Sequence, residues 1–321
     1  MSKNLIKLNH ESQSTDSSAQ EFHLTVTDSE LTAVQLLAAA SQLSGQEVKQ
    51  AMQKGCVWHS RNKHTQRLRR AKKSLQLGDE VHMYYNPMVL AQQVDDALLI
   101  SDEGDYSIWY KPFGMLCLGS KWSDHTTINR FVETHLTPQR PAFIVHRLDK
   151  ATTGLLVIAH SKSAARSLSH AFESRKTVKH YQAIVHGDFN SQSENQTNTA
   201  SDTISDTLTI NTDIDGKSAI THATCIAYNS DTNRSLLNIK IDTGRKHQIR
   251  IHLSSIGFPI VGDRLYGNDE EYNNASDADA FTERADLQLC SVYLKIPCPN
   301  ADTDTAQDKE YSIKEELTLV L

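Results

Sequence analysis

Two apolar runs joined by a short polar segment constrain this chain more than any other feature. The runs cover residues 143–145 and 155–159, and their branched side chains are typical of buried strands. Gly154, beside the second run, permits a tight backbone turn. The polar segment between the runs carries His146, Arg147, Asp149 and Thr153. The sequence therefore predicts an acid beside a base where two buried strands meet.

A carboxylate at such a junction has two interpretations. Burial disfavours the charged form of Asp149 and a neighbouring guanidinium favours it, so an ionised, reactive carboxylate needs a cation close by. The alternative is a structural hairpin with a solvated pair between Arg147 and Asp149, a kind of ion pair that stabilises little. The segment alone leaves both interpretations open.

Length and composition exclude several classes of protein. A chain of 321 residues with 38% hydrophobic and 22% charged residues is expected to form two domains, or one large domain with an appendage. Residues 1–20 hold no apolar run, and no later segment approaches ~20 apolar residues. We therefore expect neither a signal peptide nor a membrane span, and a cytoplasmic protein.

Cysteine and histidine spacing argues against a bound metal. The five cysteines are widely spread without a C-x-x-C pair, which disfavours both a disulfide framework and a zinc site. His247 and His252 are five residues apart, whereas a shared metal on a helix needs a spacing of four. We predict free thiols and no metal.

The charge of the chain is unevenly distributed. The formal net charge is -6, yet between residues 45 and 85 nine basic residues stand against three acidic ones. The acids gather in residues 188–215, expected to form a mobile insertion or a loose hairpin, and in an expected loop at 269–286. A basic module on an acidic chain is typical of a nucleic-acid-binding protein.

The order of the predicted elements divides the chain into four parts. These are a disordered tail (1–20), a small module (21–86), a polar linker (87–96) and a larger domain (97–321). In the small module two short helices, the second opened by a capping box at 44–47 and ended by Gly55, precede a small sheet. A basic loop at 61–73 lies between its strands. The larger domain is predicted to hold strands at 97–100, 106–110, 178–185, 219–228, 235–241 and 287–296, and helices at 127–135 and 161–176.

A further helix is predicted after Gly244, with Gly257 as its C-terminal cap. Arg245 and Lys246 would then lie in its first turn, where cations oppose the helix dipole. A local rule broken in this way points toward a functional site.

The small module resembles the RNA-binding domain that is shared by a ribosomal small-subunit protein and many RNA-modifying enzymes. The resemblance lies in the order helix, helix, sheet and in the phrases Lys54-Gly55-Cys56-Val57 and Leu77-Gly78-Asp79-Glu80-Val81. In that domain basic residues crowd the second helix, which here has only Lys49 and Lys54. We therefore expect the basic loop, with Arg69 and Arg70, to contact phosphates instead.

Three stretches of the larger domain together resemble the RluA-type pseudouridine synthases. His146-Arg147-Leu148-Asp149 with Thr152-Thr153-Gly154 is similar to the central motif of that family, Lys111-Pro112 with Gly114 to its first, and 243–250 with 259–263 to its last. The family often has Thr-Ser-Gly where this chain has Thr-Thr-Gly. The resemblance implies an α+β fold with a mixed, mostly antiparallel sheet and a central cleft. It also implies isomerisation of uridine in RNA to pseudouridine without a cofactor.

The resemblance also implies roles for individual residues. Asp149 matches the catalytic aspartate, Tyr181 the active-site tyrosine, and Arg245 the basic residue that pairs with the aspartate; from its strand pattern alone, Tyr181 is equally a core aromatic. Arg147 matches an arginine that displaces the target base. The further residues expected to contact RNA are His146, Lys111, Lys246 and Arg250. The expected partner is ribosomal or transfer RNA, and the expected state is a monomer.

Two other functions are weighed against this one. The first is a catalytically silent RNA-binding or ribosome-assembly factor with the same fold. The second is a hydrolase that uses His146 and Asp149, which is disfavoured because no Ser or Cys stands in a recognisable nucleophile turn. Whether Asp149 acts as nucleophile or as base is left open by the residues.

Overall fold

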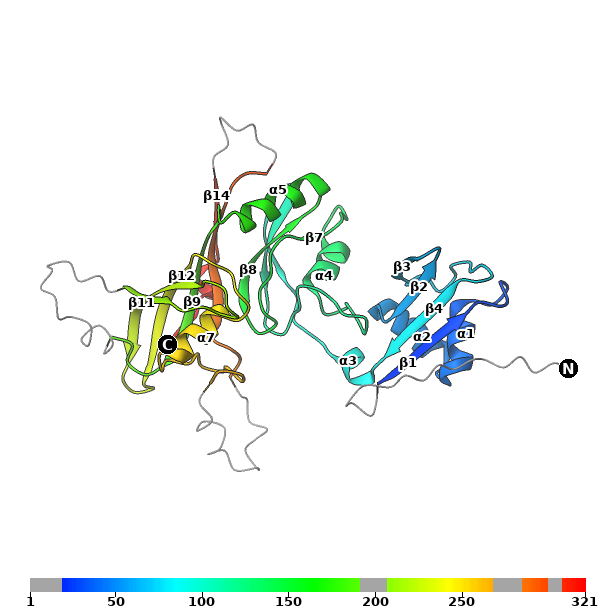
Figure 1. Ribbon diagram of the computed structural model, residues 1–321, viewed down its shortest axis with the longest axis horizontal. Helices are drawn as coiled ribbons and strands as arrows, with labels where there is room; N and C mark the ends of the chain where they lie inside the picture. The colour runs from blue at the N-terminus through cyan, green and yellow to red at the C-terminus, as the bar shows by residue number, and fades with distance from the viewer. Residues whose placement is uncertain (1–18, 191–206, 268–284, 300–307) are drawn as a thin grey trace, which may run out of the picture. The chain divides into compact units, whose positions relative to one another are not determined.

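The computed structural model describes residues 19–190, 207–267, 285–299 and 308–321, and the chain divides into two compact units (Figure 1). The first unit runs to Gln93 and also includes Leu118–Phe131, and the second contains Val94–Cys117 and Val132–Leu321. Most of the tail expected at 1–20 lies outside the described residues. Within the described residues, no helix is long and apolar enough to cross a membrane.

The first unit is a four-stranded antiparallel sheet with the two successive helices that the sequence predicts and a short third helix. Its strands lie in the order β1, β4, β2, β3. Its elements are β1 (Gln20–Thr25), α1 (Ala33–Ser41), α2 (Gly45–Lys54), β2 (Val57–Arg61), β3 (His64–Arg67), β4 (Glu80–Tyr85) and α3 (Pro87–Ala91). Three features differ from expectation. Gln20 begins a strand, and β3 lies within the expected basic loop. The expected linker starts with α3, whose N-terminus is capped by Asn86, which accepts a hydrogen bond from Val89 N–H.

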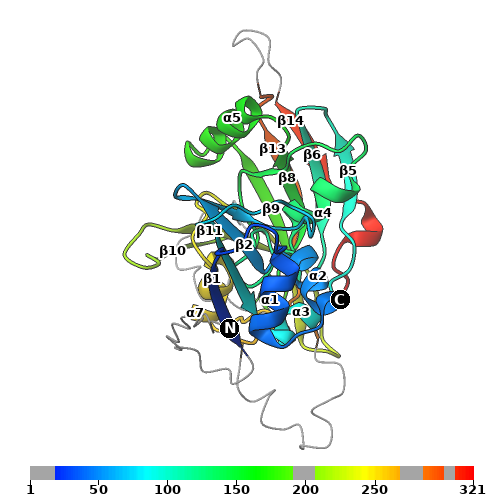
Figure 2. The same cartoon turned by 90° about the vertical axis from the view of Figure 1, so that its right-hand side faces the viewer.

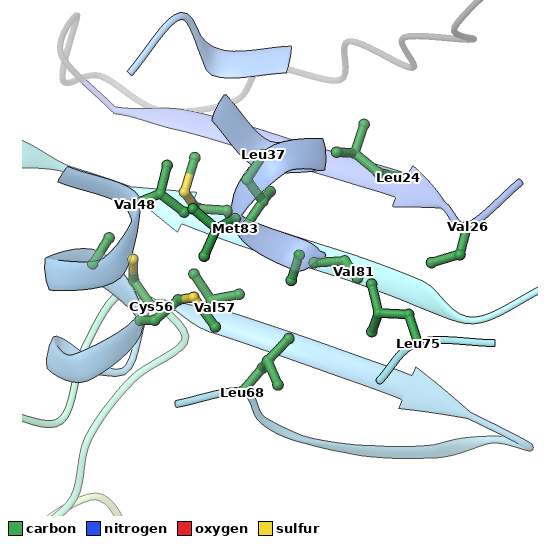
Figure 3. Close-up of a cluster of buried hydrophobic side chains, with 14 of the residues drawn as sticks. Leu24, Val26, Leu37, Val48, Cys56, Val57, Leu68, Leu75, Val81 and Met83 are labelled. Atoms are coloured by element: carbon green, nitrogen blue, oxygen red, sulfur yellow. The ribbon is translucent and has the colours of Figure 1, made fainter. Parts of the chain in front are cut away.

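The helices of the first unit form where their capping residues predict. Ser44 and Glu47 make the expected capping box, and Gly55 ends α2 in a left-handed conformation with φ 86°. The apolar faces of the helices and the sheet share one core, in which Leu37, Val48 and Met83 point toward one another (Figure 3). Burial of this apolar surface is what holds the unit together.

The segment 118–131 belongs to the first unit because it makes charged contacts there. Asp124 pairs with Arg67 at 3.0 Å and with Arg69, and Lys121 pairs with Glu21 at 2.6 Å. These partners lie more than 50 residues away in the sequence. The boundary expected at residue 97 therefore does not describe this segment.

The second unit is built on a ten-stranded mixed sheet. Its main order is β10, β11, β12, β9, β13, β8, β6, β5, with β14 beside β13 and β7 beside β8. The strands are β5 (Leu98–Asp102), β6 (Tyr106–Lys111), β7 (Phe143–Ile144), β8 (Thr153–Ala159), β9 (Val178–His186), β10 (Thr207–Asn211), β11 (Ile220–Asn229), β12 (Arg234–Ile241), β13 (Leu289–Ile296) and β14 (Lys309–Ser312). The pair β13 and β8 is parallel, and the other strand pairs described are antiparallel. The expected mixed, mostly antiparallel sheet is confirmed.

Helices flank this sheet. They are α5 (Lys162–Glu173), α7 (Gln248–Ser255) and the 3-10 turn η1 (Glu315–Leu317), whereas α4 (Ile128–His135) spans the boundary between the two units at Phe131. Helix α5 packs against β7 and β8, where its Ala164 and Leu168 join a core with Leu155 and Val157 of β8 (Figure 2). Its apolar residues recur every three or four positions, which is the spacing that buries one helix face.

The parallel pair of strands explains why a glycine follows the polar segment. Gly154 has φ 103°, and a Cβ atom there would lie 2.2 Å from the carbonyl oxygen of Ser291 on β13. A side chain would therefore clash with backbone on the neighbouring strand. The glycine fixes how closely β8 approaches β13 just after Asp149.

The two acidic stretches lie mainly outside the described residues. The expected insertion at 188–215 ends in β10, which pairs antiparallel with β11. This is the strand that a hairpin would require, whereas residues 191–206 are not described. The acidic loop expected at 269–286 lies, up to residue 284, outside the described residues.

Candidate active site

Asp149 lies in the loop that joins β7 to β8, and 30% of its side chain is exposed. The loop is tied to the turn that follows β6: Leu148 N–H donates to Cys117 Sγ at 3.3 Å, and Gly114 N–H donates to the Lys150 carbonyl at 3.0 Å. The first and central sequence motifs thus meet in space. The carboxylate is reachable from solvent and its backbone is fixed on both sides.

Lys111, at the end of β6, stands beneath this loop with no exposed surface. Its Nζ donates to the carbonyls of Pro112 and Met115, each at 2.9 Å, and of Lys150 at 3.2 Å. Burial lowers the pKa of Lys111 to about 8. The expectation that Lys111 contacts RNA is corrected, because its ammonium is enclosed by backbone carbonyls and links the two loops.

The guanidinium beside Asp149 comes from Arg250, whose Nη1 lies 3.7 Å from Asp149 Oδ2. Arg250 is itself held by Asp263, which accepts from Nε at 2.8 Å and from Nη2 at 2.7 Å, a bidentate pair with both side chains buried. Backbone N–H groups of Leu265 and Tyr266 also donate to Asp263. Although burial opposes it, this set of donors holds the pKa of Asp263 below its usual range.

This arrangement corrects the pairing expected for Arg245. The helix α7 begins at Gln248 rather than just after Gly244, so Arg245 precedes it, and its Nε donates to the Ser218 carbonyl at 3.0 Å. Arg250 occupies the third position of α7 instead. A cation in the first helical turn is thus present, as expected, but it is Arg250, and it is compensated by Asp263 and Asp149.

His247, which immediately precedes α7, is the second side chain that faces the carboxylate. Its Nε2 lies 3.9 Å from Asp149 Oδ2, and its Nδ1 lies 3.0 Å from the hydroxyl of Tyr266. Arg250 also contacts Tyr266, with its guanidinium carbon 5.1 Å from the ring centroid. Sequence reasoning considered His247 only as a metal ligand and did not consider Tyr266. His247 lies within the last family motif, which is a signal that could have found it, whereas Tyr266 lies three residues beyond that motif.

Tyr181 lies on β9, paired with Ile239 and Ser291, and is 7% exposed. Burial raises its pKa, and the negative charge of Asp149 raises it further. Tyr181 therefore keeps its proton at neutral pH and lies within electrostatic range of the carboxylate. It is at once a core residue of the sheet and a neighbour of Asp149.

His146 serves the fold in this structure. Its Nε2 accepts from Val157 N–H at 3.0 Å, and its ring stacks on Phe172 at 4.2 Å. Burial lowers its pKa to about 3, so the imidazole is neutral. Because the lone pair of Nε2 is used by a backbone donor, His146 is not available through that atom as a base for a hydrolase or as a cation for RNA.

Comparison with known proteins identifies what this site belongs to. The family model for RNA pseudouridylate synthase matches residues 105–255. An uncharacterized RNA pseudouridine synthase of Aquifex aeolicus is 30% identical over 246 residues, which are 72% of this chain and 75% of that protein. The chain belongs to the RNA pseudouridine synthase family. The resemblance seen in the sequence motifs is confirmed, and the chain is an isomerase of this class.

Other relatives of the synthase match over a smaller part. Proteins named ribosomal large subunit pseudouridine synthase D from Blochmanniella floridana and Nitrosomonas europaea are 35% and 33% identical over 49% and 63% of this chain. The matches span 51% and 57% of those two proteins, a little over half of their length. The solved structure of human RNA pseudouridylate synthase domain containing 1 shares the fold, with a TM-score of 0.52 and 22% identity over 70% of this chain and 85% of that one.

The other residues expected to contact RNA fall into two groups. Arg147 and Lys246 of the synthase are exposed or nearly so in the second unit, and Arg70 is exposed in the first. Arg69, by contrast, donates to the Gln53 carbonyl at 2.7 Å and pairs with Asp124. The expectation for Arg69 is corrected, because its guanidinium holds the segment 118–131.

Arg61 and Lys73, at the two ends of the expected basic loop, are also occupied. Arg61 donates twice to the buried Asp79, at 2.7 and 2.6 Å, and Lys73 Nζ lies 3.1 Å from His59 Nδ1. The bonds from Arg61 and His59 hold the pKa of Asp79 well below its usual range. Residues 66–73 nevertheless line a hollow of about 740 Å³, into whose wall Arg70 and Lys72 bring exposed cations. The count of basic residues therefore overstates the charge that is free to meet a ligand.

Proposed function

We propose that this synthase isomerises specific uridines of structured RNA to pseudouridine, with Asp149 as the active-site carboxylate. Ribosomal RNA is the substrate we favour, because relatives are named for the large ribosomal subunit, and transfer RNA is the alternative. The observation that carries the proposal is a partly exposed carboxylate whose Oδ2 lies 3.7 Å from Arg250 Nη1, in the loop where the first and central family motifs meet and which the last motif contacts through Arg250. A cytoplasmic location fits five free cysteines.

The reaction requires few groups other than Asp149 and its neighbours. The bond from ribose C1′ to N1 of uracil breaks, the base turns, a bond from C1′ to C5 forms, and the proton on C5 is replaced by one on N1. A carboxylate can act on C1′ as nucleophile or on the adjacent ribose carbon as base, and we leave both roles open. In either role Arg250, with its Nη1 3.7 Å from Asp149 Oδ2, is the cation that pairs with the carboxylate.

The target uridine has to leave its stack before Asp149 can reach the sugar. Unstacking costs a few kcal/mol, which contacts to the extruded base and to the gap left behind offset. Arg147 is exposed beside Asp149 and is the residue we propose to occupy that gap. Tyr181 is too buried to offer a full ring face, so we propose that an edge of its ring borders the base.

The first unit is proposed to bind the flanking RNA. Arg70 and Lys72, both exposed in the wall of the 66–73 hollow, are the cations that a phosphate backbone can meet there. Such contacts release counterions and make affinity fall with salt. The paired Arg61 and Arg69 are not part of this proposed surface.

The deciding experiment is release of tritium from RNA labelled at C5 of uridine, with ribosomal and transfer RNA prepared without modification. Asp149→Asn should abolish release while RNA affinity stays within about twofold. Asp231→Asn, at an exposed turn after β11, is the matched control and should behave as wild type. Full activity of Asp149→Asn would remove Asp149 from the mechanism. Binding without release by wild-type protein on every RNA would favour the silent RNA-binding factor.

A further inference from the structure

Two side chains contact Asp149, and each is held by a partner from the same turn of the fold. The first pair is Arg250 and Asp263, described above. The second is His247, just before α7, and Tyr266, in the turn that also contains Asp263. The resemblance to the family gave no role to His247 or Tyr266.

His247 is held in a strained conformation to face Asp149. It has φ 55°, a left-handed conformation that is unfavourable for a non-glycine residue. It occupies the N-cap of α7, yet its side chain makes no capping hydrogen bond. Its ring instead meets Tyr266 edge to face, with centroids 5.7 Å apart and planes at 72°. Strain of this kind persists where surrounding contacts fix the residue, and it gathers at functional sites.

The partners of the imidazole determine where its proton lies. Nε2 faces the Asp149 carboxylate at 3.9 Å, and a lone pair on Nε2 would be repelled by that charge. The favoured neutral form therefore carries its proton on Nε2, and Nδ1 accepts from the Tyr266 hydroxyl at 3.0 Å.

The charged groups that face His247 are consistent with a neutral ring. Burial lowers its pKa, and Arg250 and Lys246 lower it further, whereas Asp149 and Asp263 raise it. The net shift is downward from the ordinary value near 6.5. The imidazole is therefore neutral at neutral pH, where the argument about its two nitrogens applies.

We propose that His247 and Tyr266 are positioning residues for Asp149. This inference rests on the proposed function. The Tyr266 hydroxyl fixes the ring of His247, and the Nε2 proton of His247 restrains Oδ2 of Asp149, so that the other carboxylate oxygen is free to meet the ribose. Arg250 places a positive charge beside the same oxygen, and the pair of His247 and Tyr266 sets the orientation of the carboxylate. The separation of 3.9 Å between Nε2 and Oδ2 is that of an ion-pair contact, and contacts of this kind in an enzyme without substrate commonly shorten to hydrogen bonds in the substrate complex.

The sharpest variant is Tyr266→Phe, which removes the hydroxyl and keeps the ring that Arg250 covers. We expect kcat for tritium release to fall about tenfold with KM within twofold, because an orientation is lost and RNA contacts are kept. Tyr228→Phe removes a hydroxyl that donates to Asn233 in the turn between β11 and β12, and it should leave kcat unchanged. A loss of thermal stability in Tyr266→Phe with unchanged kcat would mean a merely structural role and would overturn the inference.

Two replacements of His247 distinguish the position of its Nε2 proton from the size of the side chain. In His247→Gln the amide nitrogen can stand near the position of Nε2, whereas in His247→Asn it falls short, and Asn tolerates the left-handed backbone at least as well. We expect His247→Gln to recover several-fold more activity than His247→Asn. Equal activity of the two variants would contradict a role for the Nε2 proton.

A measurement without RNA keeps the inference testable if no substrate is found. Nitrogen chemical shifts of the imidazoles in the full chain, with His247→Asn to identify the signal, should show Nε2 protonated and Nδ1 not at pH 7. In Tyr266→Phe the two forms should mix. A proton on Nδ1 in the wild type would overturn the proposed arrangement even if turnover is normal. Absence of turnover in wild type would instead count against the proposed function.

Discussion

Replacing Gly154 by alanine tests the closest backbone approach in the second unit. The new Cβ would lie 2.2 Å from the Ser291 carbonyl oxygen and 2.5 Å from its nitrogen, so β8 or β13 has to move. Overpacking of this kind costs about 1–3 kcal/mol. The φ of 103° adds about 1–3 kcal/mol, since L residues rarely adopt it. We expect the free energy of unfolding to fall by the sum of the two costs, about 2–6 kcal/mol, which lowers Tm by about 4–24 °C for a unit of this size.

The assay is urea and thermal unfolding followed by circular dichroism, with Gly216→Ala as the matched control. Gly216 also has a positive φ, of 69°, but a Cβ there meets nothing within 4 Å. The control thus carries the conformational cost alone, about 1–2 kcal/mol. If Gly154→Ala were no more destabilising than Gly216→Ala, the close approach of the two strands would be refuted as the reason for the glycine.

Two further predictions concern the exposed cations Arg70 and Lys72 and the buried Lys111. The double variant Arg70→Glu, Lys72→Glu should weaken RNA binding and flatten its salt dependence. The matched control reverses the charges of Lys162 and Arg166, on the exposed side of α5, and should leave RNA binding unchanged. Equal salt slopes of the two double variants in filter binding would mean that the 66–73 hollow does not bind RNA. Lys111→Met should lower tritium release and remove a pH dependence of stability. The pKa of Lys111 is lowered to about 8 in the native chain, whereas an unfolded lysine has a pKa of about 10.4. Between these two pH values the unfolded chain therefore binds a proton that the native chain has lost. The free energy of unfolding of the wild type should rise across this interval relative to the variant, by up to about 3 kcal/mol. Urea unfolding at pH 7.5 and 10 would show parallel changes in both proteins if the ammonium were not buried.

Local signals in the sequence predicted most of the framework. The branched runs around Asp149 are β7 and β8, the capping box at Ser44 opens α2, and the periodic run after Ser161 is α5. These elements were predictable because the signals that specify them lie within a few residues.

Contacts between distant segments account for what the sequence did not reveal. Gln248 accepts from Arg245 N–H at 3.0 Å and donates to the Ile220 carbonyl at 2.9 Å, so 244–247 form a turn and α7 starts three residues later than expected. This shift is why Arg250, and not Arg245, faces Asp149. Lys111 was misjudged for a similar reason: the three carbonyls that bind its ammonium are brought together only by the fold.

The excursion of residues 118–131 into the first unit affects how the protein can be dissected. The polypeptide passes between the units after Gln93, after Cys117 and after Phe131, so three covalent connections link them instead of one. A fragment that starts at Val94 would still carry Asp124 while lacking Arg67 and Arg69, and the isolated module would keep both arginines without their carboxylate. Loss of activity after deletion of the first unit would therefore reflect the broken ion pairs as well as any loss of RNA affinity. The matched control is a fragment of the same length in which Asp124 is also replaced.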